Sequence, residues 1–232
     1  MTHLVLLHGW GATGAVWRRQ AEALGKTCNI HSPDIPAWNA AWIQDFLGKL
    51  PLHRTVAVGW SLGGMLLLEA LACSRQQLAG LILTGVPAVF CRQEDHPWGQ
   101  PPAAVRAMRR GLKMNVRKVL EDFAGACLAA QEAEFKDEVK ALFASDAAAD
   151  HLAAGLDYLL AADLRSRLPK IANEPVLVHG DMDAIVPADQ AVYLSKRLPG
   201  SRLILLPGVG HLPFVTQWSR FNEILIETLE AE

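Results

Sequence analysis

Short apolar runs alternate with longer amphipathic stretches along most of the chain. Five runs have the length and composition of buried strands, namely Leu4–Leu7, Thr55–Gly59, Leu81–Thr84, Pro175–His179 and Arg202–Leu206, and Cys28–Ser32 is a weaker sixth. Stretches with helical spacing separate them: Ala15–Leu24, Trp42–Leu50, Leu62–Cys73, Ala188–Leu198 and a last one from Thr216 to the end. This alternation predicts an α/β protein, with a mostly parallel sheet of about six or seven strands flanked by helices on both faces.

The stretch from residue 90 to residue 168 breaks the alternation. It contains no run typical of a strand, and alanine is abundant in it. Its apolar residues predict four helices, at Pro101–Asn115, Val116–Ala130, Glu132–Ser145 and Ala147–Ala161. We therefore expect a core formed by residues 1–89 and 169–232, with residues 90–168 inserted between two strands as an all-helical cap, or lid.

Composition and charge exclude several classes of protein. Of the 232 residues, 51% are hydrophobic and 20% are charged, which is typical of a globular domain. The net charge of −2 gives no electrostatic reason to expect nucleic-acid binding. The first residues lack a basic region, and their apolar run is too short for a signal peptide or a membrane span. We therefore expect a cytoplasmic monomer that binds no membrane.

The four cysteines also exclude some kinds of site. No two of them form a C-x-x-C pair, which argues against a zinc finger or a thioredoxin-like site. A chain of this length builds its own core without a disulfide framework. We expect reduced cysteines packed as small apolar side chains, with neither a metal nor a cofactor. They are Cys28, Cys73, Cys91 and Cys127.

Ser61 is the strongest candidate for chemistry. It lies in Gly59-Trp60-Ser61-Leu62-Gly63-Gly64, directly after a predicted strand and directly before a predicted helix. A G-x-S-x-G pattern in this context is typical of a sharp turn that exposes a nucleophilic serine. Glycines are needed at its flanks because a Cβ there would collide with neighbouring backbone. The alternative is a serine that merely caps the helix in an ordinary strand–helix loop.

A serine nucleophile needs a base that removes its proton, and His211 is the candidate. His211 follows the predicted strand Arg202–Leu206, so it lies at the carboxyl edge of the sheet, where α/β proteins bind ligands. Gly208 and Gly210 give its loop the freedom to bring the imidazole toward Ser61.

An acid that orients His211 is expected on the loop after Pro175–His179, which offers Asp181 and Asp183. Asp181 follows the strand immediately and can satisfy loop amides. Asp183 lies further into the loop, so we favour it as the partner of His211. The order Ser61, Asp183, His211 is the order of catalytic residues in the α/β-hydrolase arrangement.

Two backbone N–H groups are expected to bind the oxyanion that forms during acyl transfer. One belongs to Leu62, next to the nucleophile. The other belongs to Trp10 in His8-Gly9-Trp10-Gly11, the loop after the first predicted strand. We expect His8 to support this loop through hydrogen bonds, and the alternative is a buried histidine that only packs.

Together these motifs resemble the α/β-hydrolase superfamily. Within it, the chain is most similar to the esterases that cleave the methyl ester of pimeloyl-acyl-carrier protein in biotin synthesis. The segments that carry this finer resemblance are Trp10, Val16-Trp17, Trp60, Phe90-Cys91-Arg92, Trp98, Gly155-Leu156-Asp157, Asp163-Leu164-Arg165 and Leu212-Pro213-Phe214. A departure is Ala37-Trp38-Asn39, where the family has a glycine-rich turn.

The resemblance implies a serine carboxylesterase that works through an acyl-enzyme, with acyl-carrier protein as its partner. It also implies substrate contacts from the catalytic loops and from one segment of the cap. These contacts are Trp10, Ser61, Leu62, Phe123, Ala124, Gly125, Ala126, Cys127 and His211. For each residue from Phe123 to Cys127, the alternative is a side chain that only packs in the core.

A basic stretch in the cap suits an acidic carrier protein and its phosphate-linked arm. Between positions 106 and 118 there are six basic residues and no acidic one: Arg106, Arg109, Arg110, Lys113, Arg117 and Lys118. Spacings of three and four place Arg106, Arg110, Lys113 and Arg117 on one face if a single helix continues through Gly111. The first five are the expected carrier-protein contacts, and the alternative is a solvated helix face.

Other functions share the same fold and catalytic residues. A generalist carboxylesterase and a carbon–carbon bond hydrolase remain alternatives within enzymology. A ligand receptor with a hydrolase fold is an alternative of another class, and repeated turnover of a p-nitrophenyl ester would exclude it. A scaffold role is disfavoured because the serine turn is intact.

Overall fold

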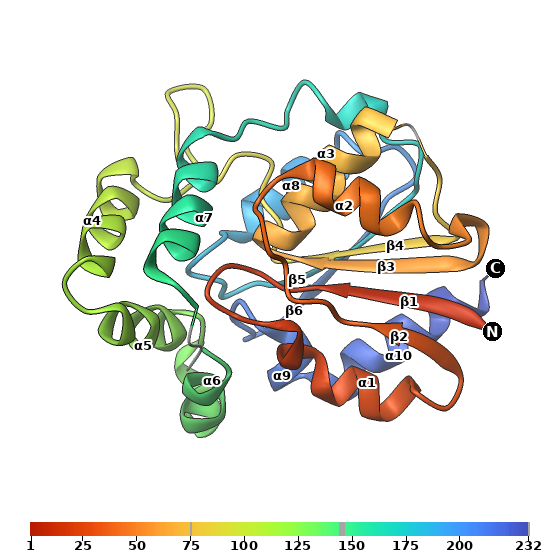
Figure 1. Cartoon of the computed structure of the whole chain (residues 1–232), viewed down its shortest axis with the longest axis horizontal. Coiled ribbons are helices and arrows are strands. Elements are labelled where there is room, and N and C mark those ends of the chain that lie inside the picture. Colours follow the sequence, from red (N-terminus) through yellow and green to blue (C-terminus); the bar gives the residue numbers. More distant parts are fainter. Residues whose placement is uncertain (75, 144–146, 232) are drawn as a thin grey trace.

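The computed structural model describes residues 1–74, 76–143 and 147–231. A six-stranded sheet in the order β2-β1-β3-β4-β5-β6 forms its centre, and each neighbouring pair is parallel (Figure 1). The strands are β1 (Thr2–Leu7), β2 (Cys28–His31), β3 (Thr55–Trp60), β4 (Gly80–Thr84), β5 (Val176–Gly180) and β6 (Arg202–Leu206). The expected α/β fold is confirmed, including the weak strand that begins at Cys28.

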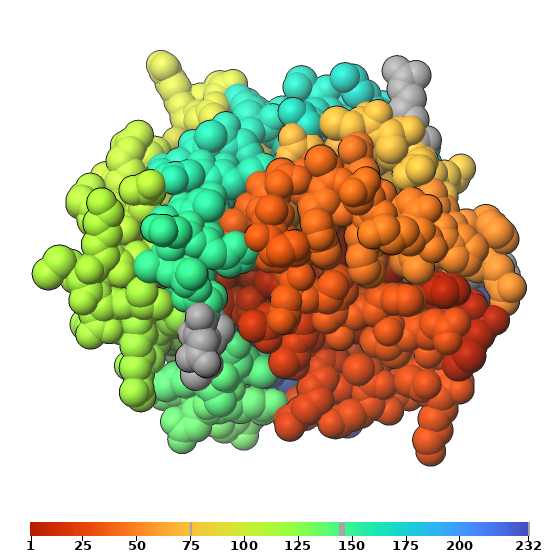
Figure 2. All heavy atoms as spheres, in the orientation of Figure 1, coloured from red at the N-terminus to blue at the C-terminus, as the bar shows by residue number. Residues whose placement is uncertain are grey.

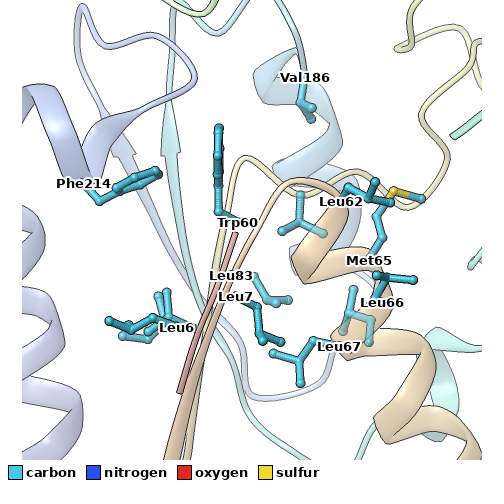
Figure 3. Packing of buried hydrophobic residues seen from close by; sticks show 14 of the residues in the cluster. Leu6, Leu7, Trp60, Leu62, Met65, Leu66, Leu67, Leu83, Val186 and Phe214 are labelled. Atoms are coloured by element: carbon cyan, nitrogen blue, oxygen red, sulfur yellow. The ribbon is translucent and has the colours of Figure 1, made fainter. Parts of the chain in front are cut away.

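The sheet is recognisable in the sequence because its central strands are buried on both faces. All six positions of β3 are buried, so its sequence after Thr55 is continuously apolar rather than alternating. Successive side chains still point to opposite faces, and Figure 3 shows Leu6 and Leu7 on opposite sides of β1. The edge strand β6 is more exposed along most of its length.

Helices cover both faces of the sheet (Figure 1). On one face lie α2 (Ala40–Leu47), α3 (Leu62–Ser74) and α8 (Ala188–Ser195). On the other lie α1 (Arg18–Leu24), α9 (Pro213–Thr216) and α10 (Trp218–Glu230). The helix α3 is buried on nearly all sides, and Figure 3 shows Leu67 packed toward the sheet. Short 3-10 turns are η1 (Gly14–Trp17), η2 (Leu52–Arg54) and η4 (Leu168–Lys170).

The chain between β4 and β5 carries the expected helices. They are α4 (Pro102–Leu112), α5 (Val116–Ala126), the 3-10 helix η3 (Ala130–Phe135), α6 (Lys136–Leu142) and α7 (Ala149–Ala161), and α4 to α7 lie beside the sheet core (Figure 1). Between positions 90 and 168, the described residues form isolated β-bridges but no named strand. Positions 144 and 145 of the predicted helix Glu132–Ser145, and position 232 of the last one, lie outside the described residues.

The two helices expected at Pro101–Asn115 and Val116–Ala130 are separate, so the condition for one shared basic face is not met. The helix α4 passes Gly111 but ends at Leu112, and α5 begins separately at Val116. The cause is Asn115, whose side-chain Oδ1 accepts a hydrogen bond from the N–H of Lys118 at 2.9 Å and thereby caps the start of α5. Arg117 therefore lies on a different helix from Arg106, and the four expected residues do not share one helical face.

Two tryptophans join the cap to the core. The indole Nε1 of Trp10 donates to the carbonyl of Leu152 at 2.7 Å, and that of Trp38 donates to the carbonyl of His151 at 2.9 Å. Both acceptors belong to α7, and a Cβ at Gly155 would lie 2.6 Å from Cδ1 of Trp10. Only a glycine there lets α7 approach the two indoles, and Figure 2 shows the border where α7 meets the core. Trp38 belongs to the segment that departs from the family pattern.

Among the described residues, we find no helix that combines the length and the apolar character needed to span a membrane.

Candidate active site

Ser61 forms a tight turn between β3 and α3. Its φ is 51°, and it is the one non-glycine residue in the described part of the chain with a positive φ. Such a conformation costs about 1–3 kcal/mol and persists only where the surroundings enforce it. Here the N–H of Ser61 donates to the carbonyl of Thr84 at 3.0 Å, and its carbonyl accepts from the N–H of Met65 at 3.0 Å. The turn expected from the sequence is present.

The glycines around Ser61 are required by close contacts. A Cβ at Gly59 would lie 2.5 Å from the Cα of Gly64, and a Cβ at Gly63 would collide with the carbonyl oxygen of His8. The backbones of strand β3, helix α3 and the loop after β1 are therefore in direct contact, with no side chain between them. This close approach is why the motif needs glycine at these positions.

His211 and Asp183 form a buried pair. Nδ1 of His211 lies 2.7 Å from Oδ2 of Asp183, and both side chains have no exposed surface. Oδ1 of Asp183 accepts from the N–H groups of Ile185 and Val186, each at 2.8 Å. The carboxylate is held from both sides, so it fixes the orientation of the imidazole. Since Nδ1 donates to the carboxylate, Nε2 of the neutral imidazole carries the lone pair.

Asp181 has the other role that the sequence suggests. Its Oδ1 accepts from the N–H of Gly208 at 2.6 Å, so it satisfies a backbone amide of the histidine loop. The structure therefore places Asp183, and not Asp181, against His211.

The backbone of His211 is held by two hydrogen bonds, and its ring is held by a glycine. The N–H of His211 donates to the carbonyl of Cys127 at 2.8 Å, and its carbonyl accepts from Nε1 of Trp60 at 3.0 Å. Gly85, directly after β4, has a φ of 58° and lies against the imidazole. Thr84 contacts Ser61 through its carbonyl, so two consecutive residues, Thr84 and Gly85, bring Ser61 and His211 to the same place.

The expected series of hydrogen bonds is only half formed. Nε2 of His211 is buried and has no hydrogen-bond partner among the described residues, so the expected bond from Ser61 is not made. Hydrogen bonds between catalytic groups are often long in free enzymes and shorten when substrate binds. Nε2 of His211 is thus a buried nitrogen without a partner at the edge of the sheet where Ser61 lies.

A second histidine lies behind the pair. Nε2 of His179 donates to the carbonyl of Val186 at 2.7 Å and lies 3.4 Å from Oδ2 of Asp183. Burial lowers the pKa of His179, so its imidazole is neutral near pH 7. His179 therefore packs behind Asp183 as a neutral imidazole whose N–H binds the backbone of Val186, and no motif in the sequence indicates this position.

The two expected oxyanion donors flank the turn. Leu62 is the first residue of α3, and the first N–H groups of a helix have no partner within it. The loop of Trp10 lies against the turn, because a Cβ at Gly9 would be 3.1 Å from the Cβ of Ser61. His8 supports this loop, as expected: Nδ1 contacts the carbonyl of Gly9 and Nε2 accepts from the N–H of Ile35, both at 2.9 Å.

Of the expected substrate contacts in the cap, some are packed inside the protein and others are exposed to solvent. Phe123 packs edge-on against Trp10, with ring centroids 5.1 Å apart, and Ala124 and Cys127 are buried. Gly125 and Ala126 are exposed on the outer face of α5, and nothing lies within 4 Å of a Cβ placed on Gly125. Consecutive residues of a helix cannot all face one side, so the structure does not bring these two to the site.

The basic residues of the cap differ in their partners. Arg109 binds Asp157 of α7 at 2.6 Å, while Arg117 and Lys118 bind acidic residues one turn further along α5, at 2.8 and 2.9 Å. Arg106, Arg110 and Lys113 are exposed. The expected basic surface is therefore smaller than its sequence suggests, since ion pairs within the cap already occupy three of its six charges.

Two residues outside the recognised motifs contact the histidine loop. Gly85 follows a predicted strand directly, which is a usable signal for a turn at the carboxyl edge of the sheet. Glu132 of η3 is buried, and its Oε2 accepts from the N–H of Gly210 at 2.9 Å. Nothing in its local sequence separates it from a solvated glutamate.

A parallel sheet with a strained serine after β3, and a histidine–aspartate pair on the loops after β5 and β6, defines the arrangement of an α/β hydrolase. The chain matches the family described as "Alpha/beta hydrolase family" over residues 4–224, and it belongs to that family.

More particular similarities are found among known proteins. The chain is 31% identical to the pimeloyl-acyl-carrier protein methyl ester esterase of Chromobacterium violaceum, over 99% of this chain and 94% of that one. It is 28% identical to the protein of the same name from Nitrosomonas europaea, over 98% and 94%. An esterase from Exiguobacterium antarcticum shares the fold, with a TM-score of 0.90, 24% identity, and coverage of 99% and 92%. These names agree with the resemblance drawn from the sequence.

Proposed function

We propose that the protein is a serine carboxylesterase that hydrolyses the methyl ester of pimeloyl-acyl-carrier protein. The observation that carries ester hydrolysis is the His211–Asp183 pair, whose 2.7 Å contact leaves Nε2 with its lone pair at the same edge of the sheet as the strained Ser61. The substrate is supported by the names of relatives that match nearly the full chain.

The reaction follows from the placement of these groups. Oγ of Ser61 attacks the ester carbonyl carbon while Nε2 of His211 takes its proton. The N–H groups of Leu62 and Trp10 bind the oxyanion. The tetrahedral intermediate then expels methanol, which receives the proton from His211. Water, deprotonated by His211, attacks the acyl-enzyme and releases the carboxylic acid and Ser61.

Asp183 supports the reaction without exchanging a proton. It holds Nδ1–H in place, which fixes the tautomer of His211 and stabilises the imidazolium that forms in each half-reaction. Its two further hydrogen bonds, to the N–H groups of Ile185 and Val186, keep the carboxylate from turning away.

The inner side of the cap suits an apolar acyl chain. Phe123 lies between Trp10 and Phe143, with ring centroids 5.1 and 5.4 Å away. A Cβ at Gly11 would be 3.0 Å from Leu120, so α5 covers the oxyanion loop with apolar side chains. We propose that this inner face, rather than the exposed Gly125 and Ala126, contacts the methylene chain.

The outer side of the cap suits the carrier protein. Exposed Arg106, Arg110 and Lys113 lie at the end of the cap formed by α4 and the turn after it. Acidic partners are attracted by such a surface over roughly 10 Å at 0.1 M salt. Arg109 and Arg117 contribute less because acidic side chains of the cap already pair with them.

The proposal includes the organisation of the chain. Residues 90–168 form the cap, and residues 1–89 and 169–232 form the core that holds the catalytic residues. All four cysteines are free, which suits the reducing cytoplasm. We propose a cytoplasmic monomer.

The test compares two substrates. The purified protein should release methanol repeatedly from the carrier-bound ester and p-nitrophenol from a short p-nitrophenyl ester, and Ser61→Ala should abolish both. Expression in a biotin auxotroph that lacks the esterase should restore growth. Turnover of the p-nitrophenyl ester without rescue would indicate a generalist esterase, and a single turnover of either ester would indicate a ligand receptor.

A further inference from the structure

Glu132 of the cap is a buried carboxylate in contact with the loop that carries His211. Only 4% of its surface is exposed. Its Oε2 accepts two hydrogen bonds, from the N–H of Gly210 at 2.9 Å and from the N–H of Ala129 at 2.8 Å. Gly210 directly precedes His211 in the chain, so Glu132 binds the backbone next to the proposed base.

The same segment of the cap binds the histidine loop at two further positions. The carbonyl of Cys127 accepts from the N–H of His211 at 2.8 Å. Nε2 of Gln131 donates to the carbonyl of Gly208 at 2.7 Å. Residues 127–132 therefore follow the loop from 208 to 211, with bonds at three of its four residues.

The contact is too close for any other residue than glycine at position 210. A Cβ there would lie 2.8 Å from both the Ala129 nitrogen and Oε2 of Glu132. The sequence suggests that Gly210 gives the loop freedom, whereas the structure shows a loop held in place.

A buried carboxylate is an expensive way to satisfy two N–H groups, because burial of a charge costs stability. Oε1 of Glu132 has no hydrogen-bond partner among the described residues, so no cation or further donor offsets that cost there. Burial and the nearby carboxylates of Asp183 and Glu132 raise the pKa of the Cys127 thiol well above its ordinary value. Both carboxylates therefore act on the same small region behind His211.

We propose that Glu132 is a positioning residue for His211: its carboxylate fixes the backbone at Gly210, which sets the place of the imidazole relative to Ser61. This inference rests on the proposed function, since it assigns to a cap residue the placement of the catalytic base. Charge-assisted hydrogen bonds are about twice as strong as neutral ones, which suits a loop that must not shift during two proton transfers.

The test uses three substitutions at one position. Glu132→Leu has a similar size and no acceptor, and Glu132→Asp keeps the charge but is too short to reach Gly210. Both should lower kcat about a hundredfold on a p-nitrophenyl ester, because a shift of about 1 Å in a catalytic group has an effect of that size. KM should change little. Glu132→Gln keeps one acceptor oxygen but loses the charge, so its kcat should lie between the wild-type value and that of Glu132→Leu.

The matched control is Asn173→Leu. Asn173 is also buried, and it makes two hydrogen bonds to the backbone of Leu78, at the opposite end of the sheet from Ser61. This substitution should lower the thermal midpoint as much as Glu132→Leu does, and leave kcat unchanged. The second measurement is the downfield NMR resonance of the Nδ1 proton of His211, which should shift in Glu132→Leu and Glu132→Asp only.

The outcomes separate this inference from the proposed function. Losses of kcat no larger than in Asn173→Leu, with an unshifted Nδ1 resonance, would overturn the role of Glu132 and leave the esterase intact. A kcat of Glu132→Gln no higher than that of Glu132→Leu would overturn the acceptor role. A wild-type protein without turnover would refute the proposed function, and the resonance would still report whether Glu132 positions the imidazole.

Discussion

Gly85 lies directly against the imidazole of His211. A Cβ at Gly85 would be 2.8 Å from Cε1 and 2.9 Å from Nδ1 of the ring, and the φ of Gly85 is 58°. Two independent reasons therefore exclude a side chain at this position: the imidazole occupies the space, and the positive φ disfavours any residue other than glycine. It is also the residue after Thr84, whose carbonyl binds the N–H of Ser61.

Gly85→Ala should displace the imidazole and weaken its 2.7 Å bond to Asp183. We expect kcat to fall about a hundredfold, since an error of about 1 Å in a catalytic group has that effect. Steady-state kinetics of p-nitrophenyl ester hydrolysis measure this fall in kcat. Gly48→Ala is the control. Gly48 directly follows α2, and its φ of −61° is an ordinary helical value that alanine also adopts. Equal kcat values for both variants would contradict the contact.

Asp183→Asn and Asp181→Asn should differ strongly. Asn at 183 favours the wrong tautomer of His211, so we expect kcat to fall by about 10² to 10⁴. Asn at 181 keeps the oxygen that accepts from the N–H of Gly208, so most activity should remain. Steady-state kinetics of the two variants at one pH decide between them. The reverse result would assign the orienting acid to Asp181.

Charge reversal on the cap should act on the carrier-bound ester alone. Arg110→Glu with Lys113→Glu should lower kcat/KM for that substrate, and the loss should shrink as salt rises, because exposed charges are screened over roughly 10 Å at 0.1 M. Hydrolysis of a p-nitrophenyl ester should stay the same. Lys26→Glu, at the other end of the sheet, is the matched control.

An equal loss on both substrates would mean that the substitutions damage the cap. An unchanged kcat/KM on the carrier-bound ester would mean that the basic residues are an ordinary solvated surface. The carrier-protein proposal would then depend on the names of the relatives.

The stability of the protein should fall in mild acid. Burial lowers the pKa of His8 and of His179 below the ordinary value of 6.5. The unfolded chain then binds protons near pH 6.5 that the folded chain does not, so the free energy of unfolding decreases as the pH falls below about 6.5. Urea unfolding between about pH 5 and 8 measures the slope. His8→Gln should flatten it, whereas the exposed His53→Gln should leave it unchanged.

The fold and the proposed catalytic residues can be predicted from the sequence for a physical reason. Strands such as β3 are buried on both faces and read as apolar runs. Ser61, Asp183 and His211 each come within a few residues after a predicted strand, and the loops after parallel strands lie at one edge of the sheet. Local sequence is therefore sufficient to bring them together.

Contacts between the cap and the core are not local, and they could not be predicted in this way. The burial of Glu132 depends on Gly210, 78 positions away. Hydrophobic spacing predicts two helices that meet at Asn115 and Val116, but it does not register the end of α4 at Leu112 or the capping side chain of Asn115. The family resemblance includes Gly125 and Ala126 in one continuous contact segment, whereas a helix turns them outward.

The two indole bonds to α7 also have a consequence for engineering. Acceptors at His151 and Leu152 are backbone carbonyls, so no single side-chain substitution in α7 removes them, but the approach requires Gly155. A cap grafted from another hydrolase would have to bring a glycine in register with Trp10 and Trp38. Without it, the indole of Trp10 would be pushed aside, and the backbone of the same residue, a proposed oxyanion donor, would move with it. The cap is not an interchangeable module.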